Sequence, residues 1–300
     1  MLKARALARR RRAVRNIWKI TRTMGLIATA RFKRAADRAL AVAQYARHLE
    51  SLLEHLLLAG KAQQSPFWAV QPASDASSVV LVLTSNRGLC GGYNSAVVRM
   101  ALGHLEKKLG GLPQDRVRIE VSGKRGASML RFTGLALGEV FTHLSERPQR
   151  SDVEVLAGRY WKSYCRGEIA SLDVVYMRLH SLSRQVPCVE TLLPFTSRSE
   201  SEDGLRERWS LPPFFDFDIY PGSQEVVEEL LPAVFEARLM RAIFDAAASE
   251  QIARMVAMRS ATENAETMLS RLALLYNRAR QTQITSELLE LMAAAEALGH

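Results

Sequence analysis

Hydrophobic side chains recur every three or four residues along the first 58 positions of the chain. This series consists of Ala13, Ile17, Ile20, Met24, Ile27, Ala35, Ala39, Val42, Ala46, Leu49, Leu53 and Leu56. The segment contains no proline and a single glycine, Gly25. Alternating steps of three and four place the series on one helix face, as in a coiled-coil seam, with a stutter near Arg31. The pattern predicts one helix from Leu2 to Leu58.

A second series of the same kind occupies the last quarter of the chain. Its members are Met255, Met258, Ala265, Met268, Leu272, Leu275, Ala279, Leu288, Leu291, Ala295 and Leu298. Ser223 is placed to cap the start of this helix, and Pro232 is expected to kink or restart it. Two seams at opposite ends of one chain most simply pair as an antiparallel coiled coil, because each then buries the face that the other supplies.

The segment between the two series reads as alternating strands and helices. Strands are predicted at Val79–Leu83, Val117–Val121, Leu135–Phe141 and Leu172–Leu179, with Gln185–Pro194 as an edge strand, and helices at Tyr93–Leu109, Gly126–Phe132 and Asp152–Gly167. This alternation implies a parallel or mixed sheet covered by helices. The predicted fold class is therefore α/β plus coiled coil, with an α/β domain inserted between the two long helices. The expected domains are an N-terminal helix (1–60), a central α/β domain (70–220) and a C-terminal helix (223–300), separated by a boundary at Gln63–Ser78 and a loop at Phe195–Gly222.

The positive charge of the chain is concentrated at its N-terminus. The formal net charge is +10, yet residues 1–38 alone hold thirteen basic side chains against one acid, Asp37. The remainder is close to neutral. A helix with this density of like charge repels itself, so an acidic partner surface is expected. An arginine-rich nucleic-acid-binding protein is the alternative, although Trp18 is the only aromatic residue among the first 31, which serves base stacking poorly.

Cysteines, histidines and apolar runs exclude several classes of protein. The three cysteines, Cys90, Cys165 and Cys188, lie far apart, which fits a reducing compartment better than a disulfide framework. The six histidines show no metal-ligand spacing, so no metal site is predicted. No run approaches the ~20 apolar residues of a membrane span, and no secretory signal is present.

A glycine-rich turn follows the first predicted strand and opens a helix, which is where phosphates bind in many proteins. Its residues are Arg87, Gly88, Leu89, Cys90, Gly91 and Gly92. The turn matches neither GxxxxGK[ST] nor GxGxxG, so a close-packed strand-to-helix turn is favoured over a nucleotide-dependent enzyme. Cys90 has no candidate base nearby in sequence and is interpreted as a small packing residue. No cofactor is predicted.

Four separated motifs resemble the γ subunits of F-type ATP synthases. They are Lys19-Ile20-Thr21-Arg22-Thr23-Met24; Thr84-Ser85-Asn86 with the glycine turn and Tyr93-Asn94; Ala248-Ser249-Glu250-Gln251 with Ala253-Arg254-Met255-Val256-Ala257-Met258; and Tyr276-Asn277-Arg278-Ala279-Arg280-Gln281 with Ile284, Thr285, Glu287 and Leu288. They occur in the family's order, and the resemblance covers essentially the whole chain.

The resemblance implies a rotor without catalytic residues of its own. The paired helices would form a shaft inside a ring of α and β subunits. The Rossmann-like central domain would form the foot, near the membrane c-ring and bound by the ε subunit, with δ also in the complex. Coupling of ion flow to ATP synthesis would proceed by rotation, with membrane association through the complex only and no nucleic acid. The expected location is the cytoplasmic face of a bacterial plasma membrane.

The resemblance also assigns roles to individual residues. The positions implied in partner contact or coupling are Met24, Arg254, Arg280, Gln281, Thr285 and Glu287. Asn86 stands where the family has an aspartate, and Trp18 stands where it has a smaller polar residue. The absence of a dithiol insert favours a bacterial over a chloroplast source.

Overall fold

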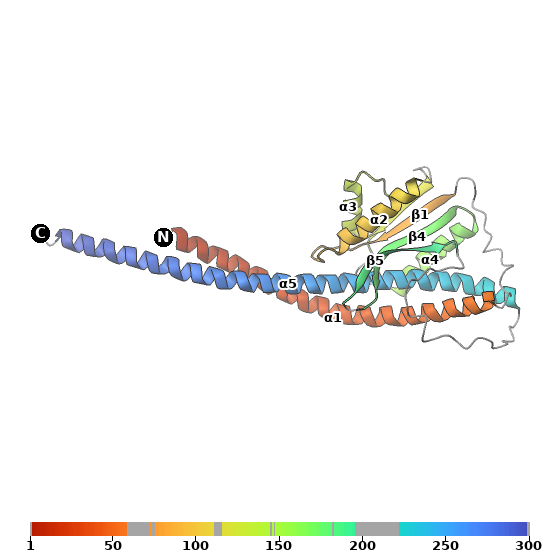
Figure 1. The fold of residues 1–300 in the computed structure, drawn as a ribbon, viewed down its shortest axis with the longest axis horizontal. Coiled ribbons are helices and arrows are strands. Elements are labelled where there is room, and N and C mark those ends of the chain that lie inside the picture. Colours follow the sequence, from red (N-terminus) through yellow and green to blue (C-terminus); the bar gives the residue numbers. More distant parts are fainter. Residues whose placement is uncertain are drawn as a thin grey trace. The chain divides into compact units, whose positions relative to one another are not determined.

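The computed structural model describes residues 2–58, 73, 76–110, 116–144, 146, 148–181, 183–195 and 222–298. Figure 1 shows the helices and strands of the chain as a ribbon. By the contacts between its residues the chain divides into two compact units. The first unit comprises Met1–Arg31, Leu89–Gly91 and Ile252–His300, and the second comprises Phe32–Gly88 and Gly92–Gln251. Most residues of the two predicted linkers, at 63–78 and 195–222, lie outside the described ranges.

The order of elements follows the predicted alternation. The elements are α1 (Leu2–Leu58), β1 (Ser77–Leu83), α2 (Tyr93–Leu109), β2 (Val117–Ser122), α3 (Lys124–Phe132), β3 (Val140–Phe141), α4 (Arg150–Cys165), β4 (Ile169–Leu179), β5 (Gln185–Leu193) and α5 (Ser223–Leu298). Both α1 and α5 contribute residues to each unit. The predicted long helices at the two ends and the intervening α/β pattern are confirmed.

A five-stranded mixed sheet forms the centre of the second unit. The strand order is β3-β2-β1-β4-β5, in which the first four strands are parallel and β5 is antiparallel to β4. The predicted edge strand is thus β5. Parallel strands joined by helical crossovers are covered on both faces, which explains the unbroken apolar run of β1. Val79, Leu81 and Leu83 face the cluster that contains α4 and α5 residues, while α2 and α3 cover the opposite face.

Two predictions about local structure are wrong in part. The predicted strand at Leu135–Phe141 shrinks to Val140–Phe141, because only these two residues pair with β2. The preceding residues reverse the chain after α3 through Gly134, whose φ is +81°. Helix α5 does not restart at Pro232 but runs through it. Buried contacts of Leu231, Val234 and Phe235 on either side hold this part of the helix in place.

The two long helices pair within the second unit. Leu53 of α1 packs with Val227, Leu231 and Val234 of α5. Arg238 Nε lies 3.3 Å from Glu50 Oε1 of α1. Ala39, nearer the start of α1, joins a cluster with residues later in α5, from Phe235 to Ala248. Since position increases along one helix as it decreases along the other, the pairing is antiparallel.

The first unit shows the same antiparallel arrangement. Val14 packs with Ala265 and Leu272. The hydroxyl oxygens of Thr21 and Thr262 lie 2.9 Å apart. Ala28, also on α1, is almost completely buried. Small residues on α1 let the helices approach closely, so the predicted pairing is confirmed in this unit as well. The predicted seam residues are wrong here. Ile20 and Ile27 are exposed, and the buried side chains are one position later, at Thr21 and Ala28.

Candidate functional site

The glycine turn between β1 and α2 is closed by hydrogen bonds at its base. Thr84 Oγ1 donates to the Ser122 carbonyl at 2.6 Å, and the Ser85 backbone N–H donates to Asn94 Oδ1 at 3.0 Å. Leu89 and Gly91 both have positive φ, +65° and +56°, which gives the turn its sharp reversal. Cys90 is buried at 2% exposure. The interpretation of Cys90 as a packing residue agrees with this burial.

Two backbone donors at the start of α3, the helix that follows β2, are already occupied. The Lys124 N–H donates to Asn86 Oδ1 at 3.2 Å, and the Arg125 N–H donates to the Ser85 carbonyl at 3.0 Å. Asn86 in turn donates through Nδ2 to the Thr142 carbonyl, a bond that an aspartate at this position could not make. A side chain at Gly126 would lie 2.2 Å from Thr84 Oγ1, so backbone and sheet are in close contact here.

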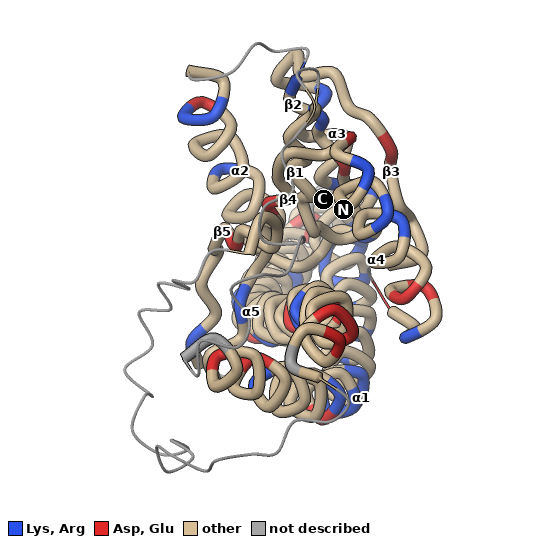
Figure 2. The backbone as a smooth tube through the Cα atoms, turned by 90° about the vertical axis from the view of Figure 1, so that its right-hand side faces the viewer, with Lys and Arg blue, Asp and Glu red and all other residues tan. Residues whose placement is uncertain are grey.

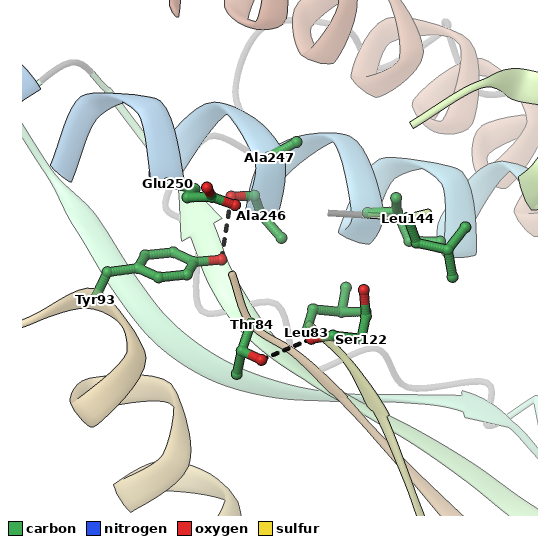
Figure 3. Close-up of a pocket in the computed structure, with 9 residues that line it drawn as sticks. Leu83, Thr84, Tyr93, Ser122, Leu144, Ala246, Ala247 and Glu250 are labelled. Carbon is green, nitrogen blue, oxygen red and sulfur yellow. Dashed lines mark hydrogen bonds between the residues drawn. The ribbon is translucent and has the colours of Figure 1, made fainter. Parts of the chain in front are cut away.

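The crevice that holds ligands in many doubly wound sheets is filled by α5 in this protein. Such ligands lie beyond the carboxyl ends of the strands. Here the Tyr93 hydroxyl, from α2, donates to the Ala246 carbonyl of α5 at 3.2 Å (Figure 3). The cavity that remains beside Thr84, Ser122 and Glu250 measures about 10 Å³. That volume suits a single water molecule and not a nucleotide.

The residues of the described ranges form no group of three or more potential metal ligands. His104, for instance, is engaged by one carboxylate, with Nε2 at 2.9 Å from Asp173 Oδ2. The three cysteines form no disulfide, and Cys90 alone is buried among them.

The basic side chains near the start of α1 have no acidic counterpart in the described part of the first unit. Arg5, Arg9, Arg10, Arg12 and Arg15 are exposed, and none forms an ion pair with a described residue. Figure 2 marks the lysine and arginine positions along the backbone in blue. For these five arginines, the described residues of the chain supply no countercharge by direct ion pairing.

The six residues implied in coupling all lie in the first unit. Met24 is half-buried on α1, next to Gly25, where an added Cβ would lie 3.5 Å from Met258 Cβ of α5. Arg254 is buried on α5 at 7% exposure. The remaining four are exposed on α5 beyond Leu272, the last buried side chain among those described; they are Arg280, Gln281, Thr285 and Glu287.

The exposed group on α5 is arranged by the helix alone. The Thr285 hydroxyl donates to the Gln281 carbonyl at 3.0 Å, and Gln283 Nε2 donates to Glu287 Oε1 at 2.8 Å. Both bonds join residues four apart in the same helix. These side chains are therefore polar, exposed and held by bonds within one helix.

Comparisons with known proteins decide the family. A family profile described as ATP synthase matches residues 3–298. A relative from Rhodopirellula baltica, named ATP synthase gamma chain, is 42% identical over 99% of both chains. The chain belongs to the ATP synthase gamma chain family. A further gamma chain, from Moorella thermoacetica, is 33% identical over 99% of this chain and all of the relative.

Solved structures show the same fold as this gamma-chain family member. The rotor of Euglena gracilis mitochondrial ATP synthase aligns with a TM-score of 0.62 at 16% identity, covering 94% of this chain and 98% of that one. The central stalk and c-ring structure from Tetrahymena thermophila aligns with a TM-score of 0.55 at 19% identity, over 81% and 99%. The comparisons give no support to the nucleic-acid-binding alternative.

Sequence reasoning missed a buried carboxylate that joins α2 to the sheet of this gamma chain. Asp173 on β4 accepts hydrogen bonds from His104 and Lys108 of α2, and from the Thr191 hydroxyl of β5 at 2.7 Å. Burial raises the pKa of the Asp173 carboxyl, but the hydrogen bonds outweigh burial and lower that pKa to about 2. The signal in the sequence is a charged residue within the otherwise apolar run from Leu172 to Met177.

A second buried network links the β4–β5 pair to α5. Glu190 on β5 accepts from the Tyr176 hydroxyl at 2.7 Å, from Arg238 Nη2 of α5 at 3.0 Å, and from Arg178 of β4. Burial raises the Glu190 pKa, but Arg238 and Arg178 outweigh it and hold the pKa below its usual value. The residues that contact Glu190 lie up to 48 positions away in sequence, so no local sequence pattern predicts these contacts.

Asp245 of α5 lies in the same unit with a weaker set of partners. It is buried at 4% exposure. Burial raises the pKa of its carboxyl to about 7, although Arg241 one turn earlier and a hydrogen bond from the Leu179 backbone oppose the shift. The carboxyl therefore changes charge near neutral pH, unlike that of Asp173.

Proposed function

We propose that the chain is the non-catalytic rotor subunit of the central stalk of an F-type ATP synthase. In this role it couples ion flow through the membrane sector to ATP synthesis or hydrolysis at the β subunits by rotation. Support comes from membership in the gamma chain family and from the fold shared with rotor structures. The closed glycine turn and the filled crevice favour a role without bond chemistry in this chain.

The observation that carries the proposal is the apolar surface of α5 beyond Leu272. No described side chain after Leu272 is buried, yet many are large and apolar: Leu274, Leu275, Ile284, Leu288, Leu289, Leu291 and Met292. At 100° per residue these positions spread over more than half of the helix circumference, too wide for a single seam. Apolar surface of this extent is typical of protein interfaces. A sleeve formed by the α and β subunits would cover it.

The positive charge at the start of α1 also supports an interface with the α and β subunits. The exposed arginines near the start of α1 would face acidic segments of the β subunits. Long-range attraction of this kind favours orientation and correct pairing over raw affinity. A rotating contact needs such smooth attraction, because a set of tight, directional bonds would have to break at every step.

The chain would act on the β subunits by contacting them differently at each angle of rotation. Each angle of the shaft would favour a different conformation of a β subunit, which shifts the equilibrium among open and closed states. Met24, Arg254, Arg280, Gln281, Thr285 and Glu287 are the positions proposed to influence this coupling. Residues 1–60 and 223–300 would act as the shaft, and residues 70–220 as the foot.

The further partners follow from this placement. We infer that the foot meets the ε subunit and the c-ring, that δ belongs to the same complex, and that the complex lies at the cytoplasmic face of a bacterial plasma membrane. None of the described helices carries an apolar stretch long enough to cross a membrane. The chain would associate with the membrane through the complex only.

Reconstitution tests the proposal. The purified chain should show no ATPase activity alone and should restore ATP-driven rotation when mixed with α and β subunits. Coupled ATP synthesis should return when the membrane sector is added. Full coupled activity in the absence of this chain would overturn the proposal.

A further inference from the structure

Trp18 of α1 contacts α5 in two different ways. Its indole Nε1–H donates to Glu266 Oε1 at 2.8 Å, across 248 positions of sequence. Its ring packs against the small apolar cluster that includes Val14 and Leu272. The guanidinium carbon of Arg22, one turn later on α1, lies over the ring at 5.1 Å from its centroid. The indole is thus held by a hydrogen bond, by apolar packing and by a cation–π contact.

Neighbouring contacts between the helices are less selective. Around Gly25 and Ala28 the helices approach through small side chains, and apolar contact has no preferred direction. A hydrogen bond, by contrast, weakens steeply when its distance or angle changes. Sliding one helix by a single residue, ~1.5 Å, would change the length and the angle of the Trp18–Glu266 bond and so weaken it. The nearby Thr21 and Thr262 hydroxyls, 2.9 Å apart, add a second directional contact.

Trp18 lies close to the point where the described buried contacts between α1 and α5 end. Leu272 is the last buried side chain of α5 among those described, and it packs against Val14 of α1. Beyond it α5 presents exposed apolar surface. A force applied to that part of α5 reaches α1 only through contacts between the two helices. Trp18 and Glu266 lie within two turns of this point.

We propose that Trp18 and Glu266, with Arg22 stacked on the indole, form a register lock between α1 and α5. In this lock Trp18 is a positioning residue, which keeps the two helices from sliding where load passes from α5 to the pair. The lock itself depends only on the contacts described; its effect on torque rests on the proposed rotor function.

The lock is tested first in the full chain, without other subunits. The chain has four tryptophans, and the indole N–H signal of Trp18 is assigned by its loss in Trp18→Phe in a nitrogen-15 NMR spectrum. Glu266→Ala should shift this signal and speed its exchange with water. Glu266→Gln should preserve both, because an amide oxygen still accepts the bond. An unchanged signal in Glu266→Ala, or equal damage in Glu266→Gln, would overturn the lock.

A matched control is available one turn earlier on α5. Glu263 is also exposed and pairs with Arg259 of its own helix at 3.1 Å. Glu263→Ala removes a carboxylate from the same helix without touching the contact between helices. It should leave the Trp18 signal unchanged, and a shift as large as that of Glu266→Ala would contradict the proposal.

The role in torque is tested in the assembled complex in sealed vesicles. The readout is the ratio of ATP-driven ion pumping to ATP hydrolysis. Trp18→Phe and Glu266→Ala should each lower this ratio, and the double variant should be no worse than either alone. Glu266→Gln and Glu263→Ala should match the wild type. A wild-type ratio in Trp18→Phe overturns the role in torque, whereas a wild-type chain that fails to support pumping overturns the proposed function instead.

Discussion

At Asp173 three elements of the sheet domain meet on one carboxylate. Helix α2 provides His104 and Lys108, β4 provides the acid, and β5 provides Thr191. Because a buried charge without partners is costly, the three donors are needed to stabilise this carboxylate, and its removal would deprive all three of a shared acceptor. Asp173 therefore stabilises the packing of α2 against the sheet.

Asp173→Asn should destabilise the chain at neutral pH. The carboxyl pKa is lowered from 3.8 to about 2 on folding, so its stabilising effect is fully present above pH 3.8. The shift corresponds to about 2 kcal/mol of unfolding free energy. Urea unfolding should show this loss at pH 7 and a smaller loss as pH falls toward 2. The exposed Asp37→Asn serves as the control, and an equal effect of both changes would contradict the prediction.

Asp245→Asn should have the opposite effect. Folding raises the pKa of this carboxyl from 3.8 to about 7, so the native state is penalised increasingly as pH rises from 3.8 to 7. The amide removes the penalty and can still accept the hydrogen bond from the Leu179 backbone. Thermal unfolding should show little gain at pH 4 and a gain of up to about 4 kcal/mol at pH 8. A loss of stability at pH 8 would show that pairing with Arg241 outweighs burial.

At the scale of elements, periodicity in the sequence was sufficient to place the helices and most strands. The steps of three and four along α1 and α5 predict the helices, and from Ala39 to Leu53 they also predict the buried face of α1. In the first unit they do not, because the seam shifts by one position and leaves Ile20 and Ile27 exposed. The short β3 and the continuous α5 were not predictable in this way. The turn at Gly134 shortens β3. Buried residues on either side of Pro232 keep α5 continuous through this proline.

Pro232→Ala tests how much α5 depends on those neighbours. Proline inside a helix removes one backbone hydrogen bond and its ring crowds the preceding turn, at a cost of about 3 kcal/mol. Alanine restores an N–H that can donate to the Glu228 carbonyl. We expect the unfolding free energy to rise by about 1–3 kcal/mol in urea titration. A decrease would mean that the ring of Pro232 contributes packing that alanine cannot replace.

At the scale of the whole molecule, the chain presents surfaces that it does not cover with its own described residues. These are the exposed arginines near the start of α1 and the apolar side chains of α5 beyond Leu272. Neither contributes to the core of the unit to which it belongs. Both become explicable when the chain is one subunit of a larger assembly, because partner subunits would then supply the acid and the apolar contact.

Met24→Lys tests the coupling role at this scale. The substitution adds a charge to a half-buried seam position on an already basic helix. In the assembled complex we expect ATP hydrolysis to survive while ion pumping driven by ATP falls, measured in sealed vesicles. Met24→Leu keeps the side chain apolar and should behave as wild type. Unchanged pumping in Met24→Lys would remove Met24 from the coupling residues.

The sequence alone determined the two long helices, their antiparallel pairing, the inserted α/β domain and the family, because periodic burial and ordered motifs are local properties of a chain. Tertiary structure decided which charges are buried together, why the glycine turn is closed, and that α5 fills the crevice at the strand ends. It also joined Trp18 to Glu266. Such contacts link residues tens to hundreds of positions apart, and only the folded backbone brings those residues within hydrogen-bond distance.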